Sequence, residues 1–211
     1  AHFIDHQEIF VKTLFAPGHA AALNPTMSRL ESASMAAVLL ALLLASFGPA
    51  VAQHAQYHAF ADQRSWWGVP CLLDVLSNVP FAVAGAWGLL ALRHWQLSPA
   101  CGLNAELYAL QRRLAGLFFV GLLLTALCSS VYHWHPDNAG LALDRLGMVV
   151  AFAGLLGLAV ADRISGRAGV MVAVALLLTG PLSVAVWFQS GNLLPWVVLQ
   201  AGGMLLMLCL A

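Results

Sequence analysis

The polar residues best suited to chemistry lie where one apolar run ends and the next begins. Ser129 and His133 are four residues apart, and Asp144 follows His133 after ten intervening residues. If the first run continues as a helix through His133, the hydroxyl and the imidazole share one helical face. Pro136 then ends that helix, and a short turn brings the chain back. The spacing therefore predicts that a serine, an imidazole and a carboxylate meet at one end of two neighbouring helices.

Three interpretations of this trio remain open. The first is a Ser-His-Asp nucleophilic triad, although serine and histidine on adjacent turns of one helix place the hydroxyl poorly for the usual proton relay. The second is a zinc site, because an imidazole binds zinc, a nearby carboxylate can deprotonate bound water and a hydroxyl can donate to an oxyanion. One histidine does not hold a catalytic zinc, which normally has three protein ligands. The third is a polar cluster that only joins two helices.

A second polar segment lies near the start of an earlier apolar run. Asp74, Ser77 and Asn78 are spaced i, i+3 and i+4, so a helix would place them on one face. Ionisable residues inside a spanning helix are costly and are functional candidates by default. For Asp74 and Asn78, hydrogen bonding between neighbouring helices is an equally good interpretation.

The composition indicates that these residues belong to a membrane protein. Of the 211 residues, 61% are hydrophobic and 9% are charged, with nine basic and nine acidic side chains. Soluble domains are about 45–50% apolar and about 25% charged. The composition therefore excludes an ordinary soluble protein, a disordered chain and, without any basic excess, a nucleic-acid-binding protein. The expected surroundings are a lipid bilayer.

Six apolar runs have the length that spans a membrane, for which about 20 residues are needed. They are Met35–Ala52, Leu72–Leu92, Leu114–Val131, Leu141–Ala161, Ala168–Phe188 and Leu193–Ala211. The sequence predicts an all-α, polytopic transmembrane helix bundle in residues 35–211, preceded by an N-terminal segment, 1–34. The first run, after Arg29 and ending in Ala50-Val-Ala52, is equally compatible with a cleaved signal peptide and with a retained helix.

Both ends of the chain suggest that it is a piece of a longer protein. It begins with Ala1, and Met27 is the expected natural start. The last run reaches Ala211 without a polar flank, so we expect further sequence there and seven or eight spans in the intact protein.

Arginines predict the orientation, because short cytoplasmic loops collect Lys and Arg. Seven basic residues fall on one side and two, Arg64 and Arg145, on the other. The seven are Lys12, Arg29, Arg93, Arg112, Arg113, Arg163 and Arg167. Loops 53–71 and 132–140 are therefore expected outside the cytoplasm, which in a bacterial inner membrane means the periplasm.

Cysteines and tryptophans are expected to be structural. No CxxC pair occurs, so the cysteines are interpreted as apolar fillers rather than as disulfide or zinc residues. They are Cys71, Cys101, Cys128 and Cys209. Tryptophans at the ends of runs are typical of an interfacial aromatic belt. These are Trp66, Trp67, Trp134, Trp187 and Trp196.

Two motifs together resemble the alkaline ceramidase family of seven-helix membrane hydrolases, in its bacterial form. One is Ser129-x-x-x-His133 followed by Asp144 in Leu-Asp-Arg-Leu-Gly-Met, and the other is Asp74-Val-Leu-Ser-Asn78-Val-Pro-Phe. The resemblance covers about residues 57–161. It implies zinc-dependent hydrolysis of the amide bond of ceramide or a related lipid. His133 would be a zinc ligand, Asp144 would orient or deprotonate the zinc-bound water, and Ser129 would support the metal site or the oxyanion.

The chain departs from this family in its histidines. The family completes its zinc site with an HxxxH pair on its last helix, and no histidine follows His135 here. We expect the missing ligands beyond Ala211 and expect the chain as given to be inactive.

His54 and His58 are a weaker alternative for the two missing zinc ligands, and His135 is interpreted as an interfacial residue. A calcium site at Asp62 is a further implication of the resemblance, and a non-catalytic receptor or scaffold of the same superfamily is the alternative function.

Overall fold

The computed structural model describes residues 28–94 and 105–211, apart from the side chain of Ser34. All regular elements in these ranges are helices, which confirms the predicted all-α bundle. They are α2 (Arg29–Phe47), α3 (Leu72–Leu76), α4 (Val79–His94), α5 (Ala105–Trp134), α6 (Asn138–Arg163), α7 (Gly166–Ser190) and α8 (Leu194–Leu210). Most of segment 1–34, including Lys12 and the expected start at Met27, lies outside the described residues, as does Cys101.

Within the described residues, five helical segments are long and apolar enough to cross a membrane: α2, the α3–α4 pair, α5, α6 and α7. The sixth predicted run forms α8, an apolar helix of 17 residues that is shorter than the others. The protein is therefore a multi-pass integral membrane protein.

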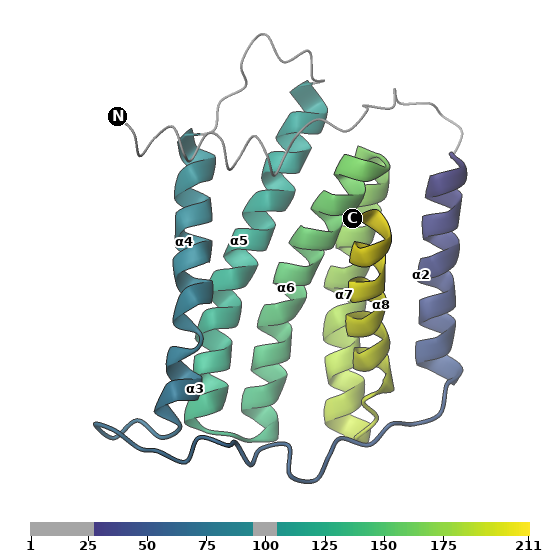
Figure 1. Ribbon diagram of the computed structural model, residues 1–211. Helices are drawn as coiled ribbons and strands as arrows, with labels where there is room; N and C mark the ends of the chain where they lie inside the picture. Colours follow the sequence, from purple (N-terminus) through teal and green to yellow (C-terminus); the bar gives the residue numbers. More distant parts are fainter. Residues whose placement is uncertain (1–27, 95–104) are drawn as a thin grey trace.

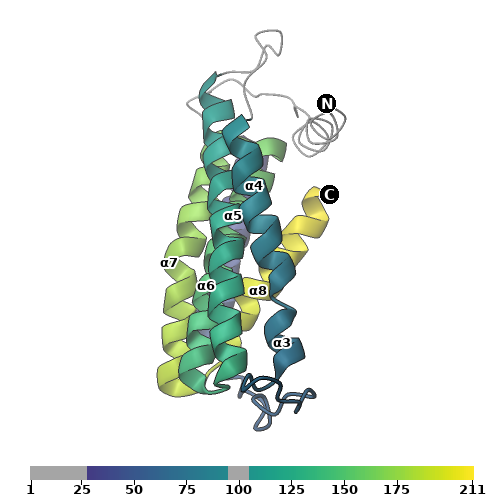
Figure 2. The ribbon, with the colours of Figure 1, turned by 90° about the vertical axis from the view of Figure 1, so that its left-hand side faces the viewer.

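Four helices stand in chain order, each packed against the next: α4, α5, α6 and α7 (Figure 1). Helix α8 packs on α6 and α7, and α2 packs on α8. Figure 2 shows α8 inclined to the other helices. Helix α5 therefore has α4 on one side and α6 on the other, and the candidate site lies among these three.

The second predicted run is not one continuous helix. Helix α3 ends at Leu76, and α4 begins at Val79. Pro80 is the physical reason, because it has no N–H to donate to the Leu76 carbonyl and its ring clashes with that carbonyl, so a continuous helix is interrupted there. The Ser77 hydroxyl and the Asn78 amide donate instead to the Asp74 carbonyl, at 2.6 and 3.1 Å. The polar residues of this segment thus stabilise the break, rather than forming one face of a straight helix as expected.

Glycines allow α5 and α6 to approach closely. A Cβ atom added to Gly121 would lie 2.2 Å from the Ala151 backbone nitrogen, and one added to Gly154 would lie 2.2 Å from that of Phe118. Small residues at such crossings are the usual means by which membrane helices pack. This contact fixes the register of α5 against α6, and with it the relative position of Ser129 and Asp144.

Candidate functional site

The site begins at the turn between α5 and α6. Helix α5 continues through His133 to Trp134, as the spacing predicted. The Asp137 carboxylate then caps α6 by accepting a hydrogen bond from the Gly140 N–H at 2.7 Å. This short, capped turn brings the first turns of α6 alongside the last turns of α5.

The structure brings Ser129, His133 and Asp144 together. The Ser129 hydroxyl is within hydrogen-bonding reach of the Asp144 carboxylate, and His133 is close enough to that carboxylate for an electrostatic interaction. Ser129 is buried, whereas Asp144 and His133 are half-buried. The hydroxyl and the carboxylate therefore meet, and the imidazole lies one helical turn beyond the hydroxyl on α5.

Ser129 and Asp144 line a cavity of about 380 Å³ between α4, α5 and α6. The rest of the lining is mainly apolar and aromatic: Phe81, Phe118, Leu122, Met148, Ala151, Phe152 and Leu155, with Asn78 and Thr125. An apolar cavity with a few polar groups at one place is the usual form of a small-molecule site. The arrangement can hold a hydrocarbon chain with its polar group at Ser129 and Asp144.

Four polar side-chain atoms are buried without a partner in the described structure. They are Asp74 Oδ2, Thr125 Oγ1, His133 Nδ1 and Arg145 Nη1. The His133 ring also packs on Phe60, with ring centroids 4.6 Å apart. Buried polar atoms normally find partners. Of the four residues, Thr125 lines the cavity, so its unpaired hydroxyl marks the cavity wall as a place for a ligand or for water.

His58 belongs to a closed hydrogen-bond network. Its Nδ1 is 3.0 Å from the Tyr132 hydroxyl, and its Nε2 is 2.9 Å from Asn138 Oδ1. A tautomer that accepts from Tyr132 and donates to Asn138 satisfies both ring nitrogens. His54 Nδ1 accepts from the Gln56 N–H at 3.2 Å. The substitute pair His54 and His58 is therefore engaged in the chain's own hydrogen bonds.

Arg145 is enclosed by aromatic rings on the side of α6 that faces α7 and α8. Only 3% of the residue is exposed, and its guanidinium lies 4.1 Å from the Trp187 ring centroid and 5.5 Å from that of Trp196. Its Nη2 donates to Gln53 Oε1 at 3.0 Å. Both tryptophans are 4% exposed, so their expected place in an interfacial belt is wrong. They shield a buried cation through cation–π contacts.

Asp62, the calcium candidate, already has partners for both carboxylate oxygens. Oδ1 accepts from Arg64 Nε at 2.6 Å, and Oδ2 accepts from the Leu73 N–H at 2.9 Å. The hydrogen bond from the Arg64 side chain, followed by the one from Leu73, holds the pKa of Asp62 below its usual value. An arginine at this distance repels a second cation, so these residues do not fit calcium.

The described residues do not complete a zinc site. Within residues 28–94 and 105–211, no group of three His, Cys, Asp or Glu side chains is placed to hold a metal ion. His133, with its unpartnered Nδ1, is a suitable single ligand, whereas a catalytic zinc normally has three protein ligands. Asp144 and Ser129 stand beside it without making the set complete.

Two residues at or beside the site were not predicted from the sequence. Thr125 lies one helical turn before Ser129 and lines the same cavity, which the i, i+4 spacing could have indicated. Tyr132 is buried and bonds His58 across 74 residues of sequence, a pairing for which the sequence contains no local signal.

Comparison with known proteins finds no family model, no curated protein and no solved structure that matches this chain.

Proposed function

We propose that this protein binds ceramide or a related lipid amide in the cavity between α4, α5 and α6, and hydrolyses its amide bond as the ceramidase resemblance implies. The observation that supports this is the mainly apolar cavity whose polar groups include Ser129 and Asp144. A lipid amide has the matching form, because it combines hydrocarbon chains with one compact group of donors and acceptors.

The chain's own residues suffice to bind and orient such a lipid. Aromatic walls at Phe81, Phe118 and Phe152 would take the hydrocarbon. The Ser129 hydroxyl can donate to the amide oxygen, and the Asp144 carboxylate can accept from an amide N–H or a lipid hydroxyl. Binding would exchange the contact between Ser129 and Asp144 for contacts to the lipid.

Zinc would supply an activated water for the hydrolysis, with His133 as one ligand. Since the described residues do not provide a complete ligand set, we assign no step to the metal. This same observation favours a second candidate function, a non-catalytic receptor or scaffold that binds the lipid and leaves it intact.

Metal and lipid measurements on the purified full-length protein separate the two functions. For the hydrolase we expect about one zinc per chain, and ceramide cleavage detectable by mass spectrometry. Both should be lost in His133→Ala and kept in His135→Ala, an exposed neighbour. Ser129→Ala should impair cleavage, whereas Ser183→Ala, on α7, should not. Ceramide binding without zinc or cleavage supports the receptor, and absence of ceramide binding contradicts both functions.

We further propose that the protein lies in a bacterial inner membrane with this cavity at the periplasmic side. Arginines toward the other end of the bundle support this. Arg93 is in the last turn of α4, Arg112 and Arg113 lie in the N-terminal part of α5, and Arg163 and Arg167 flank the turn from α6 to α7. A topology reporter fused after Asn138 should be active only outside the cytoplasm. A cytoplasmic signal would overturn this orientation.

A further inference from the structure

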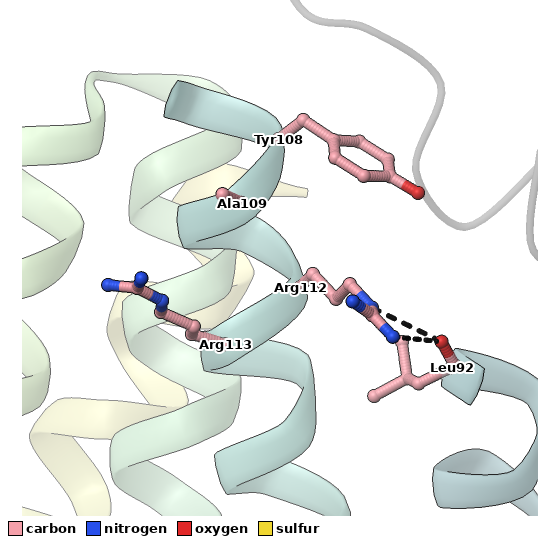
Figure 3. A pocket seen from close by; sticks show the side chains of 5 residues that line it. All are labelled: Leu92, Tyr108, Ala109, Arg112 and Arg113. Atoms are coloured by element: carbon pink, nitrogen blue, oxygen red, sulfur yellow. Dashed lines mark hydrogen bonds between the residues drawn. The ribbon is translucent and has the colours of Figure 1, made fainter. Parts of the chain in front are cut away.

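A second cavity lies at the opposite end of the bundle from the candidate site. It has a volume of about 440 Å³, is lined by Leu92 of α4 and by Tyr108, Ala109, Arg112 and Arg113 of α5, and is shown in Figure 3. Arg112 and Ser129 are 17 residues apart on one helix, which corresponds to about 25 Å along its axis. The proposed lipid amide site therefore does not involve this cavity.

Arg112 is held in place by the end of α4. Its Nε and Nη2 both donate to the Leu92 carbonyl, at 3.2 and 2.9 Å (Figure 3). This carbonyl lies in the last turn of α4, where the helix itself offers no partner. The two hydrogen bonds fix the plane of the guanidinium and leave its Nη1 donors for another acceptor.

Arg113 supplies a second guanidinium to the same cavity. The residue is exposed, and Figure 3 shows its side chain leaving α5 in a different direction from that of Arg112. No described residue forms a hydrogen bond or an ion pair with it. Among the described residues, none therefore competes with an anion for its five donors.

Two carboxylates at this end of the bundle, Asp162 and Glu31, have partners that do not line the cavity. Asp162 accepts from Gln111 at 3.3 Å and lies 3.6 Å from Arg163. Glu31 accepts a hydrogen bond from Ser165 in the turn between α6 and α7. Glu106, in the first turn of α5, also has an interaction partner. With Arg93 in the last turn of α4, the surroundings of the cavity carry an excess of positive charge.

The cavity lies at the level of lipid headgroups. Leu92 is in the last turn of the span Leu72–His94, and Tyr108 is in the first turn of the span Ala105–Trp134. Hydrocarbon gives way to headgroups at such helix ends, where tyrosine is common. Basic pockets between membrane helices bind acidic headgroups, and the guanidinium fork matches the geometry of phosphate.

We propose that this cavity binds the phosphate of an anionic phospholipid headgroup, with Arg112 and Arg113 as its donors. A free phosphate ion offers the same chemistry, but the headgroup is delivered at the level of the two guanidinium groups.

Native mass spectrometry of the delipidated protein tests this proposal, with phosphatidylglycerol and phosphatidylcholine as the probes. Phosphatidylglycerol should bind more tightly. Arg113→Gln should raise its Kd about fivefold, as should Arg112→Gln where that variant folds. Arg163→Gln, which removes the same charge at the same end of the bundle, should leave the Kd unchanged.

Three results would overturn the proposal. Equal binding of the two lipids would exclude recognition of the anion, and an equal loss in Arg163→Gln would assign the effect to general surface charge. Competition by inorganic phosphate at matching concentration would assign the site to a free anion. Because Arg113 is exposed and forms no hydrogen bond or ion pair with a described residue, its variant should fold. None of these results bears on ceramide cleavage, so this proposal and the proposed function fail separately.

Discussion

Thr125 has a buried hydroxyl without a partner in the wall of the candidate cavity. Thr125→Val keeps the shape of the side chain and removes the unpaired polar atom. We expect the free energy of unfolding to rise by about 1 kcal/mol, because an unsatisfied buried hydroxyl costs about that much. Unfolding of the protein in mixed micelles measures the change.

Thr179→Val is the matched control for this substitution. The Thr179 hydroxyl donates to the Ala175 carbonyl at 2.7 Å, so its removal loses a hydrogen bond and should leave stability unchanged or reduced. A Thr125→Val protein less stable than the natural one would show that the hydroxyl has a stabilising partner.

Local spacing was sufficient to predict the three central residues of the site but not their surroundings. Ser129 and His133 share a face because a helix repeats every 3.6 residues, and Asp144 returns beside them because the turn is short. Trp187 and Trp196 look like interfacial residues in the sequence. Their burial depends on Arg145, which reaches them from another helix, and such contacts are not encoded in any local pattern.

The beginning of α3 depends on a carboxylate from the preceding loop. Asp62 accepts from the N–H of Leu73, one of the first helical donors that α3 cannot satisfy internally. Because the pKa of Asp62 is held below its usual value in the folded protein, its contribution to stability is present above that usual value and is lost as the pH falls through the folded pKa.

Hydrogen exchange at the Leu73 amide tests this dependence. Protection should be high at a pH of about 6 and should fall as the pH is lowered below the usual pKa of an aspartate. Asp62→Asn should show low protection at both values, because the neutral amide is a weaker acceptor for Arg64 and Leu73. Asp74→Asn, a carboxylate substitution inside α3, should retain the pH dependence. Protection in Asp62→Asn equal to that of the natural protein would contradict the assigned role.

The contact between α5 and α6 requires a glycine at position 121. Gly121→Ala places a methyl group 2.2 Å from backbone atoms of α6, which cannot move away as a flexible side chain would. We expect a loss of about 1–3 kcal/mol in the free energy of unfolding. Gly202→Ala in α8 meets no atom within 4 Å and should be neutral or slightly stabilising. Equal effects of the two substitutions would show that the helices tolerate a wider separation.

Helix boundaries were harder to predict from the sequence than helix existence. The run beginning at Leu114 extends back to Ala105, because residues such as Gln111 and Arg112 are good helix formers despite their polarity. The break between α3 and α4 could have been predicted from Pro80 and from the amide and hydroxyl beside it. The hydrophobicity of the run concealed it.

At the scale of the whole molecule, composition alone predicted a membrane bundle, but not which helices are neighbours. Helix α2 packs on α8, near the other end of the chain, and no sequence pattern pairs them. Val51 follows α2 and is joined to the turn before α8, with its N–H donating to Asn192 Oδ1 at 3.1 Å and its carbonyl accepting from the Leu193 N–H at 2.7 Å. One end of α2 is fixed by these contacts.

Glu31 fixes the other end of α2. Its carboxylate accepts from the Ser165 hydroxyl at 2.6 Å and from Arg167 Nη2 at 2.9 Å, at the turn between α6 and α7. It also accepts from the Ser28 N–H at 2.8 Å, closing a capping box at the beginning of α2. We expect Glu31→Gln to weaken all three contacts, because the amide carries no charge and has one acceptor oxygen in place of two. Hydrogen exchange in the first turns of α2 should then become faster, while α5 and α6 stay protected.

Arg29→Gln serves as the control, because it changes a charge in the same helical turn at an exposed position. It should leave the exchange rates unchanged. Slow exchange in α2 of both variants would show that packing on α8 alone holds the helix. Faster exchange throughout the bundle in Glu31→Gln would show that α2 is required for the stability of the whole fold, rather than attached to it at two points.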